Sequence, residues 1–387
     1  MSTAKKNYVK FAPKGEDSFY DAVKYRVQEY FRTNNITEHA NTAMRLKTVA
    51  MLSLYIVPYL LIVTGVGSVN TWLFMGLWVL MGVGIVGIGT GIMHDSNHGS
   101  YSTNKRLNTL LGNVLNMLGG YALNWRIQHN VLHHTYTNLQ GLDEDIDSGI
   151  LIRMSPQKEY RKFHRYQHIY AWLLYPLMNL FWVTVKDFRQ VMRYEEQGLL
   201  RNQKMTFGKA MRQLTMVKLV YFAYALVLPM IFSGMAWYMV LAGFVAMQMV
   251  AGLSLACIFQ PAHVMETSDY AEPDDKRKME NAWAVHQVLN TTDFCPKSKI
   301  TSWFMGGLNY QIEHHLFPHI CHIHYPKIAP IVRETVLEYG LPYNVVPTFL
   351  GALVEHGKML KILGQEPVPA VISSTPAVVP ELVEAEY

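Results

Sequence analysis

Four long apolar runs, separated by polar stretches, dominate the pattern of hydrophobic positions along the chain. A helix needs about 20 predominantly apolar residues to cross the hydrocarbon core of a bilayer. The runs that approach this length form two pairs, and each pair is joined by a short turn without Lys or Arg: 49–67 with 71–93, and 217–233 with 235–259. The pattern therefore predicts an all-α integral membrane protein with four transmembrane helices in two hairpins.

A fifth apolar stretch, residues 171–185, is shorter. Its 15 residues would form a helix of about 22 Å, whereas the hydrocarbon core is about 30 Å thick. Its Trp, Tyr and Asn side chains suit the membrane interface, where amphipathic rings are favoured. We therefore expect this stretch to be interfacial. An even number of spans then separates the polar segments around residues 94–134 and 314, so that both lie on one side of the membrane.

Basic residues set the expected orientation. No Lys or Arg occurs from Thr48 to Asn104 or between Lys218 and Lys276, so all 34 lie opposite the hairpin turns. The positive-inside rule places that side, with both termini and the polar segments, in the cytoplasm. A bacterial inner membrane is the expected location.

Composition narrows the class of protein and its partners. Hydrophobic residues make up 50% of the chain and charged residues 16%, against about 25% charged in a typical soluble domain. The net charge of +5 comes without a dense basic cluster, which favours an anionic membrane surface over nucleic acid. The three cysteines show no CxxC spacing, as is typical of a reducing compartment. The oligomeric state is left open by these features.

Three segments are expected along the chain. Residues 1–45 form an N-terminal cytoplasmic segment, in which Ser18–Phe31 has the spacing of an amphipathic helix that lies on the membrane or caps the core. Residues 46–345 form the membrane domain. Residues 346–387 form a C-terminal segment whose proline-rich, acidic end is expected to be disordered.

Three histidine clusters lie in the polar segments, each near the end of an apolar run: "HDSNH" (94–98), "HNVLHH" (129–134) and "QIEHH" (311–315). Residues four apart share one face of a helix, which makes two natural ligand pairs, His94 with His98 and His129 with His133. Adjacent residues differ by about 100°, so His134 and His315 are directed toward a second metal ion. Imidazole suits iron, zinc or copper. The clusters therefore predict a site for two neighbouring metal ions.

The combination of HxxxH, HxxxHH and QxxHH with two hydrophobic hairpins resembles the histidine boxes of integral-membrane fatty acid desaturases. "GGLNYQIEHHLFP" (306–318) is similar to front-end acyl desaturases, in which glutamine replaces the first histidine of the third box. "HNVLHHTYTNLQGLDEDID" (129–147) resembles the bacterial members of that group. The resemblance covers roughly residues 10–345 and implies a non-haem centre of two Fe ions, with O2 as co-substrate.

Carried over box by box, the resemblance implies nine metal ligands. Gln311 takes the place of a histidine, and His263 in "FQPAHV" matches a histidine that members have after the last span. The implied ligands are His94, His98, His129, His133, His134, His263, Gln311, His314 and His315, and the eight histidines among them are the implied catalytic residues. The implied reaction introduces a cis double bond into a long-chain fatty acyl substrate, as acyl-lipid or acyl-CoA.

Each turnover also requires two electrons from outside the chain, because the sequence has no flavin or NAD fingerprint. Many front-end desaturases carry a fused cytochrome b5 domain with an HPGG motif, which this sequence lacks. We therefore expect a separate ferredoxin or cytochrome b5-like donor on the cytoplasmic face. The acyl tail is expected to enter an apolar tunnel, lined by the spans and by residues 107–121.

Other polar residues near the boxes are expected to support the site. Asp95 and Glu313 are placed to orient ligand imidazoles. The acidic loop after the second box is either solvated or positions helices and the donor: Asp143, Asp145 and Asp147. The residues before that box are expected to pack, or to contact a lipid headgroup: Trp125, Arg126 and Gln128.

The remaining histidines are expected outside the metal site. His164 and His168 match no box and are expected to pack at the interface, while His286 is expected beside the ligands. Pro318 breaks the helix of the third box. The histidines that follow it are therefore expected to support the ligands or to lie on the surface: His319, His322 and His324. Surface positions are also expected for His39 and His356.

Three alternatives remain open from the sequence. A fatty acyl or lipid hydroxylase or ketolase would use the same scaffold, and "QIEHH" with "GGLN" favours desaturation over it. A membrane zinc-dependent lipid hydrolase would need fewer ligands and one open position. A metal transporter would place its histidines within the spans rather than just outside them.

Overall fold

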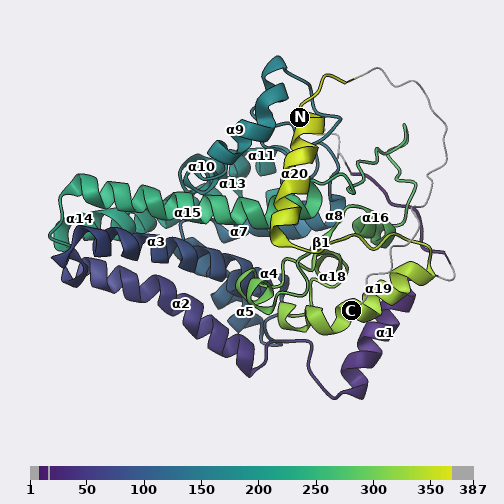
Figure 1. Ribbon diagram of the computed structural model, residues 1–387, viewed down its shortest axis with the longest axis horizontal. Coiled ribbons are helices and arrows are strands. Elements are labelled where there is room, and N and C mark those ends of the chain that lie inside the picture. Colours follow the sequence, from purple (N-terminus) through teal and green to yellow (C-terminus); the bar gives the residue numbers. More distant parts are fainter. Residues whose placement is uncertain (1–7, 16–17, 368–387) are drawn as a thin grey trace.

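The computed structural model describes residues 8–15 and 18–367 of the 387-residue chain. Within these residues four helical segments are long and apolar enough to cross a membrane: Thr42–Val63, Thr71–His98, Phe207–Phe232 and Trp237–His263. They run side by side away from a cap of shorter helices, and the two hairpin turns lie at their far end (Figure 1). The predicted all-α membrane architecture with four spans is confirmed. The tail predicted to be disordered lies mostly outside the described residues.

The first hairpin pairs α2 (Thr42–Val63) with α3 (Thr71–Gly87) across the short η1 (Val66–Val69). Asn41 caps α2 by accepting a hydrogen bond from the amide of Met44, so the helix begins before the apolar run does. The two helices approach closely at Gly84, where a Cβ atom would lie 2.9 Å from the backbone nitrogen of Tyr55. The second span continues through the π-helical η2 (Ile88–Met93) into α4 (His94–His98).

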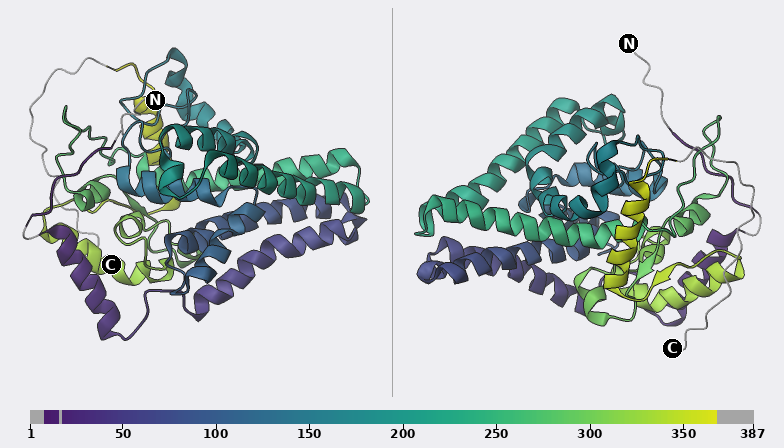
Figure 2. Two further views of the ribbon diagram at one scale, coloured as in Figure 1. Left: turned by 180° about the vertical axis from the view of Figure 1, so that it is seen from behind. Right: turned by 45° about the horizontal axis from the view of Figure 1, so that its top comes forward.

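The second hairpin begins with α13 (Phe207–Phe222), which continues through the π-helical η6 (Ala223–Val227) into α14 (Leu228–Phe232). After a short turn, α15 (Trp237–His263) returns to the cap and packs against α3. Large apolar side chains fill the contact between the hairpins: Trp78, Met81, Phe244 and Met247. The views in Figure 2 agree that the two hairpins lie together.

The fifth apolar stretch folds as α9 (Gln167–Leu174), α10 (Leu177–Phe181) and the π-helical η5 (Trp182–Lys186). It packs against α15, where a Cβ atom on Gly252 would lie 2.5 Å from the carbonyl oxygen of Pro176. Its outer side exposes a stripe of apolar side chains four residues apart: Ile169, Leu173, Leu177, Phe181 and Val185. This stripe suits contact with lipid, and none of these helices is long enough to span.

The stretch leads into α11 (Asp187–Glu196) and α12 (Leu199–Asn202). Between the two hairpins, and before this stretch, lie α5 (Lys105–Gly112), α6 (Val114–Met117), α7 (Ala122–Trp125), η3 (Arg126–His133), α8 (His134–Tyr136) and η4 (Lys162–Tyr166). The stretch expected to line a tunnel thus forms α5 and α6, which contact η2.

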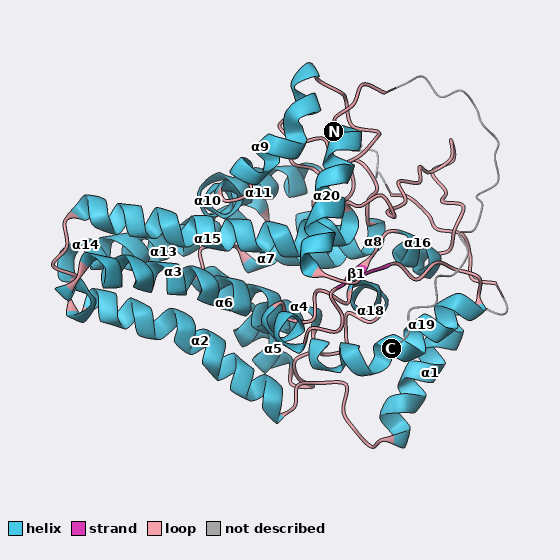
Figure 3. Ribbon diagram, in the orientation of Figure 1, coloured by secondary structure: helices cyan, strands magenta, loops and turns pink. Residues whose placement is uncertain are grey.

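Helices are also the main regular elements of the remaining cap, where they are joined by long loops (Figure 3). It contains α1 (Phe19–Thr33), α16 (Trp283–Leu289), α17 (Lys299–Phe304), α18 (Gln311–Leu316), η7 (His322–His324), α19 (Tyr325–Glu338) and α20 (Phe349–Leu363). In the described residues, the strands are β1 (Asp293–Phe294) and β2 (Val345–Val346), paired in parallel. The predicted amphipathic helix over Ser18–Phe31 is α1, which packs against α19 and caps the core.

Candidate metal centre

Four separate segments bring their histidines together at the boundary between the spans and the cap. The first box ends the second span in α4, and His263 is the last residue of α15. The second box lies on η3 and α8, and the third lies on α18. His98 is half-buried and the other residues that the resemblance implied as ligands are buried: His94, His129, His133, His134, His263, Gln311, His314 and His315.

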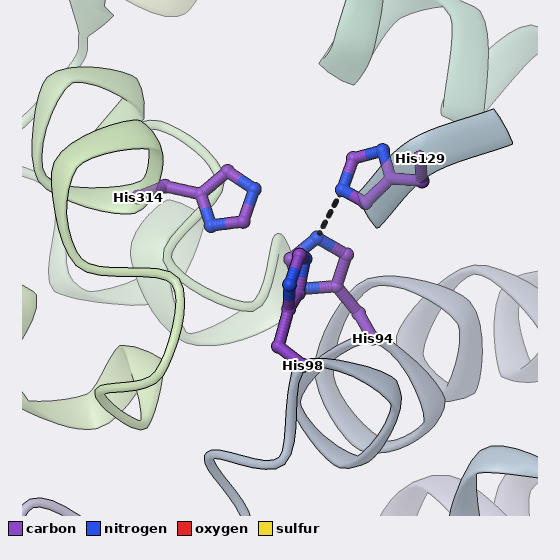
Figure 4. A group of neighbouring side chains, drawn as sticks. All are labelled: His94, His98, His129 and His314. Carbon is purple, nitrogen blue, oxygen red and sulfur yellow. Dashed lines mark hydrogen bonds between the residues drawn. The ribbon is translucent and has the colours of Figure 1, made fainter. Parts of the chain in front are cut away.

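Most of the ring nitrogens form two groups, within each of which the possible ligand atoms lie within 4.8 Å of one another. The first group comprises His94, His98, His129 and His314, whose rings converge from three elements (Figure 4). The second group comprises His133, His263 and His315. His134 lies between them, because its Nε2 is 3.2 Å from Nε2 of His129 and it also gathers with the adjacent pair His314 and His315.

The positions of the ring nitrogens suit binding to metal ions better than hydrogen bonding among the histidines. Nε2 of His98, His314 and His315 is buried and has no hydrogen-bond partner among the described residues. Leaving a buried polar group unpartnered costs about 1–3 kcal/mol. Nε2 of His94 lies 3.1 Å from Nε2 of His129, and nitrogen ligands about 2.1 Å from one metal ion stand at such separations. The donor set therefore suits transition-metal ions at both groups.

Hydrogen bonds to Nδ1 fix the rings of the second group. Nδ1 of His133 lies 3.0 Å from Asp143 Oδ2, Nδ1 of His263 lies 3.1 Å from the carbonyl oxygen of Asn290, and Nδ1 of His315 lies 2.8 Å from Gln287 Oε1. Each partner accepts, so Nδ1 carries the proton and Nε2 stays free for a metal ion. In the first group, His314 Nδ1 has a longer contact of 3.3 Å with the hydroxyl of Tyr325.

Burial and neighbouring charges divide the imidazoles into two kinds. Burial, together with the neighbouring histidines, holds the pKa of four rings well below its usual range: His129, His134, His314 and His315. Burial also lowers the pKa of His133, but the carboxylates of Asp143 and Asp145 outweigh it and raise this pKa to about 9. The four rings are therefore neutral ligands near pH 7, whereas a metal ion must displace a proton from His133.

The local backbone departs from a regular α-helix at two places in the site. In the π-helical η3, the amide of His134 donates to the carbonyl of His129, five residues earlier. This winding places His129 and His134 close together, and such π-turns are frequent at functional sites. Before the third box, Gly306 and Gly307 both have positive φ, of 63° and 68°. A Cβ atom on Gly307 would lie 2.8 Å from Cβ of His322. The absence of a side chain at Gly307 in "GGLN" therefore lets this backbone turn lie close to His322.

Three further side chains of the boxes, Gln311, Asp95 and Glu313, have different hydrogen-bond partners. Gln311 Nε2 donates to the carbonyl of Leu308, while its Oε1 is buried without a partner among the described residues. Asp95 Oδ2 lies 2.8 Å from Nδ1 of His322, and Asp95 Oδ1 is 3.7 Å from Nδ1 of the candidate ligand His94. Glu313 contacts the hydroxyl of Tyr343 at 2.9 Å instead of an imidazole, and its pKa is raised by burial and by a neighbouring carboxylate.

The acidic loop and the residues before the second box pack around the site. Asp143 is buried on His133, and Asp145 accepts a hydrogen bond from Gln128. Asp147 lies 3.4 Å from Nζ of Lys158, away from the ring nitrogens. Trp125 packs its indole against three rings of the first group, with centroids 4.5–5.9 Å apart: His94, His98 and His129. Arg126 donates to Asn97 Oδ1.

Among the other histidines, one expectation is wrong. His356 was expected on the surface, but it is fully buried, with Nε2 2.6 Å from the hydroxyl of Tyr175 and Nδ1 2.9 Å from the carbonyl oxygen of Val264. His356 is buried because α20 packs against α15, a helix that lies far from it in the sequence. His39 is half-buried, and its Nδ1 lies 3.1 Å from the carbonyl oxygen of Ser100.

The remaining histidines lie outside the two groups. His164 contacts the carbonyl oxygen of Ile150, and His168 lies in the first turn of α9. His286 contacts the carbonyl oxygen of Thr137, next to the second group. After Pro318, His319 is exposed, and His324 Nε2 lies 3.1 Å from the carbonyl oxygen of His39.

The sequence did not single out Gln287, Asn290 or Tyr325, which contact ligand-type rings. Gln287 is fully buried, and its Oε1 lies 2.7 Å from the hydroxyl of Thr137 as well as 2.8 Å from His315. The signal for it was indirect: Gln287 is a polar position beside the buried apolar residues Ala284 and Val288 on α16.

Comparison with known proteins shows to which family the chain belongs. The family model described as "Fatty acid desaturase" matches residues 70–347. The chain is 37% identical to the sn-1 linoleoyl-lipid 6-desaturase of Arthrospira platensis, over 90% of this chain and 93% of that protein. It is also 37% identical to the acyl-lipid (8-3)-desaturase of Physcomitrium patens, over 93% of this chain and 74% of that protein. The chain thus belongs to the fatty acid desaturase family and is an integral-membrane fatty acid desaturase.

Proposed function

We propose that this protein introduces a cis double bond into a long acyl chain of a membrane lipid, at a centre of two iron ions and with O2 as the oxidant. The observation that carries the proposal is the convergence of eight histidines from four segments, seven of them in two adjoining groups and His134 between the groups. The relatives named above act on linoleoyl-lipid and acyl-lipid substrates, which favours a lipid-bound acyl chain over acyl-CoA.

The two iron ions would be held by the two histidine groups. The first ion is assigned to the first group, His94, His98, His129 and His314, and the second ion to the second group, His133, His263 and His315. His134 lies between the two positions, and the unpartnered Oε1 of Gln311 completes the nine proposed ligands. Iron bound there supplies the O2 chemistry that removes hydrogen from unactivated methylene carbons.

The protein's own residues orient the ligands and limit the access of water. Asp143, Gln287 and the carbonyl of Asn290 fix the rings of the second group with Nε2 unblocked. Trp125 and the buried third box cover the first group. His98 and His263 end two of the spans, so the centre lies at the boundary where an acyl tail from the bilayer would reach it.

The proposed orientation places the centre, the cap and both termini on the cytoplasmic side of a bacterial inner membrane. It rests on the absence of Lys and Arg from the hairpin turns of the four spans. A ferredoxin or cytochrome b5-like protein on that side would deliver the two electrons. The hydroxylase, ketolase and zinc hydrolase alternatives gain no support from the relatives, which are named as desaturases.

Product and metal analysis test the proposal together. The chain is produced in a host with a simple fatty acid profile, and its lipids are examined by mass spectrometry. Acyl chains that have lost two hydrogens support desaturation, whereas chains that have gained oxygen indicate a hydroxylase or ketolase. The purified protein should contain two iron ions; a single zinc ion without iron would overturn the proposed centre.

A further inference from the structure

A buried polar cluster lies beside the first histidine group, and the proposed centre does not use it. It consists of Lys47 on α2, Asp95 on α4, and Cys321 with His322 in the turn after the third box, and each is at most 4% exposed. A lysine buried at the end of a membrane span is costly unless it is paired. The cluster therefore calls for a physical role.

The hydrogen bonds of the cluster have one consistent direction. Lys47 Nζ lies 2.9 Å from Nε2 of His322, and because an ammonium group has no acceptor, Nε2 accepts. The ring proton is then on Nδ1, which donates to Asp95 Oδ2 at 2.8 Å. The same carboxylate oxygen accepts from the thiol of Cys321 at 3.0 Å and from the amide of His322 at 3.3 Å.

These contacts argue against a third metal ion, although Asp95, Cys321 and His322 offer ligand-type atoms close together. Both ring nitrogens of His322 are already engaged, one of them by a cationic group. A metal ion would have to displace these hydrogen bonds next to the charge of Lys47. The cluster is thus an internally satisfied network.

The first box is where such a network is needed. Nδ1 of His94 has no hydrogen-bond partner among the described residues, whereas the rings of the second group are held through Nδ1. The carboxylate oxygen Oδ1 of Asp95, the next residue, lies 3.7 Å from that nitrogen. The position of His94 therefore depends on its backbone and on where Asp95 is held. Asp95 ties that backbone to the turn that follows the third box. Gly91 makes room for this contact, because a Cβ atom there would lie 3.2 Å from Lys47 Nζ.

We propose that His322, held by Lys47, is a positioning residue that fixes Asp95 and thereby keeps His94 in place for the first metal ion. The inference rests on the proposed two-iron function. It gives His322 a role distinct from that of a ligand. It also links the first span to the metal centre, from Lys47 through His322 and Asp95.

Two conservative variants separate the two halves of the network. Asparagine carries an N–H donor on the atom bonded to Cγ, as Nδ1 is, so His322→Asn keeps the donor toward Asp95. Glutamine places its polar atoms one bond further out, so His322→Gln keeps a partner for Lys47 and loses the donor toward Asp95. His164→Gln is the matched control, because His164 is also buried and has backbone hydrogen bonds, but belongs to neither histidine group.

Iron content and the Mössbauer spectrum of the purified full-length protein are the readouts, with thermal unfolding alongside. We expect His322→Gln to lower iron affinity about 10- to 100-fold at one position and to change one of two iron signals. His322→Asn should retain both signals, as should the control. Lys47→Met should weaken the same signal as His322→Gln, because without the ammonium group on Nε2 the ring proton of His322 is no longer confined to Nδ1, the atom that donates to Asp95.

The outcomes distinguish this inference from the proposed function. Wild-type protein that holds no iron would refute the two-iron centre itself. Wild-type protein with two irons, together with a His322→Gln variant that keeps both signals unchanged, would refute the positioning role alone. Equal loss of both signals in the glutamine, asparagine and control variants would show general unfolding and would likewise refute it.

Discussion

The first and second histidine groups both consist of imidazole rings, but different contacts hold the rings in the two groups. Each ring of the second group has a hydrogen-bond acceptor on Nδ1, at 2.8–3.1 Å. In the first group, three rings pack on the indole of Trp125, and His314 has a 3.3 Å contact with a tyrosine hydroxyl. Directional contacts fix the angle of a ring, whereas packing mainly fixes its place. The two proposed iron positions should therefore differ in affinity and in response to substitution.

The largest effect should follow from removing one ring of each group. His314 and His315 are adjacent, but they belong to the first and second groups respectively. We expect His314→Ala and His315→Ala each to abolish the unsaturated product and to lower bound iron from two ions toward one. Iron analysis and mass spectrometry of host lipids would measure this. Spectra that lose the same iron signal in both variants would contradict the division into two groups.

The next prediction concerns how iron affinity depends on pH, which should differ between the two groups because His133 of the second group is protonated. Below its raised pKa of about 9, His133 carries a proton that a metal ion must displace. Iron affinity at the second position should thus rise about tenfold per pH unit between about pH 6.5 and pH 8. Affinity at the first position should stay nearly constant, because burial keeps His129 and His314 neutral there. Anaerobic titration with iron(II) would measure both.

Asp143→Asn is the control for this pH dependence. Removing the carboxylate charge lowers the pKa of His133, so the variant should bind the second ion with less dependence on pH. An unchanged slope in this variant would show that the displaced proton comes from another group.

The sequence pattern predicts those parts of the fold that follow from regular helix geometry. The four spans and the amphipathic helix α1 follow from apolar spacing alone. The adjacent pair His314 and His315 also lies as a regular helix requires, one ring in each group. These features depend on local geometry that every helix of this composition shares.

The remaining features depend on contacts between distant segments, or on departures from regular helix. Gln287 reaches His315 from 28 residues away, and His322 reaches Asp95 from 227 residues away. The π-helical turn in η3 brings together His129 and His134, which a 3.6-residue period does not pair. The burial of His356 arises from the packing of α20 on α15. Spacing within one segment carries no information about such contacts.

A moderate effect should follow from Gln287→Leu, which removes the acceptor of His315 Nδ1 while keeping the size of the side chain. We expect iron affinity at the second position to fall about 10- to 100-fold, with the first position retained. Competition with a chelator, followed by iron analysis, would show one labile and one retained ion. Gln287→Glu, which keeps an acceptor, is the matched control, and it should lose less.

A smaller effect should follow from Trp125→Leu, which removes the ring packed on the first group. Leucine keeps part of the apolar packing, so we expect a net loss of about 1 kcal/mol, within the roughly 0.5–1.5 kcal/mol of one aromatic contact. This corresponds to a several-fold loss of iron affinity, confined to the first position. Trp125→Phe keeps a ring and should lie between this variant and the wild type. Loss of the second ion instead would contradict the assignment of Trp125 to the first group.

The smallest effect is expected at His319, four residues beyond His315. His319 is exposed, follows the proline that ends the third box, and lies 6.2 Å from the ring of Phe317 by centroid. His319→Ala should change the free energy of unfolding by no more than about 0.5 kcal/mol and leave both iron ions and the product in place. A His319→Ala protein that lost iron would mean that the histidines after Pro318 belong to the centre, and the two groups would then need to be redrawn.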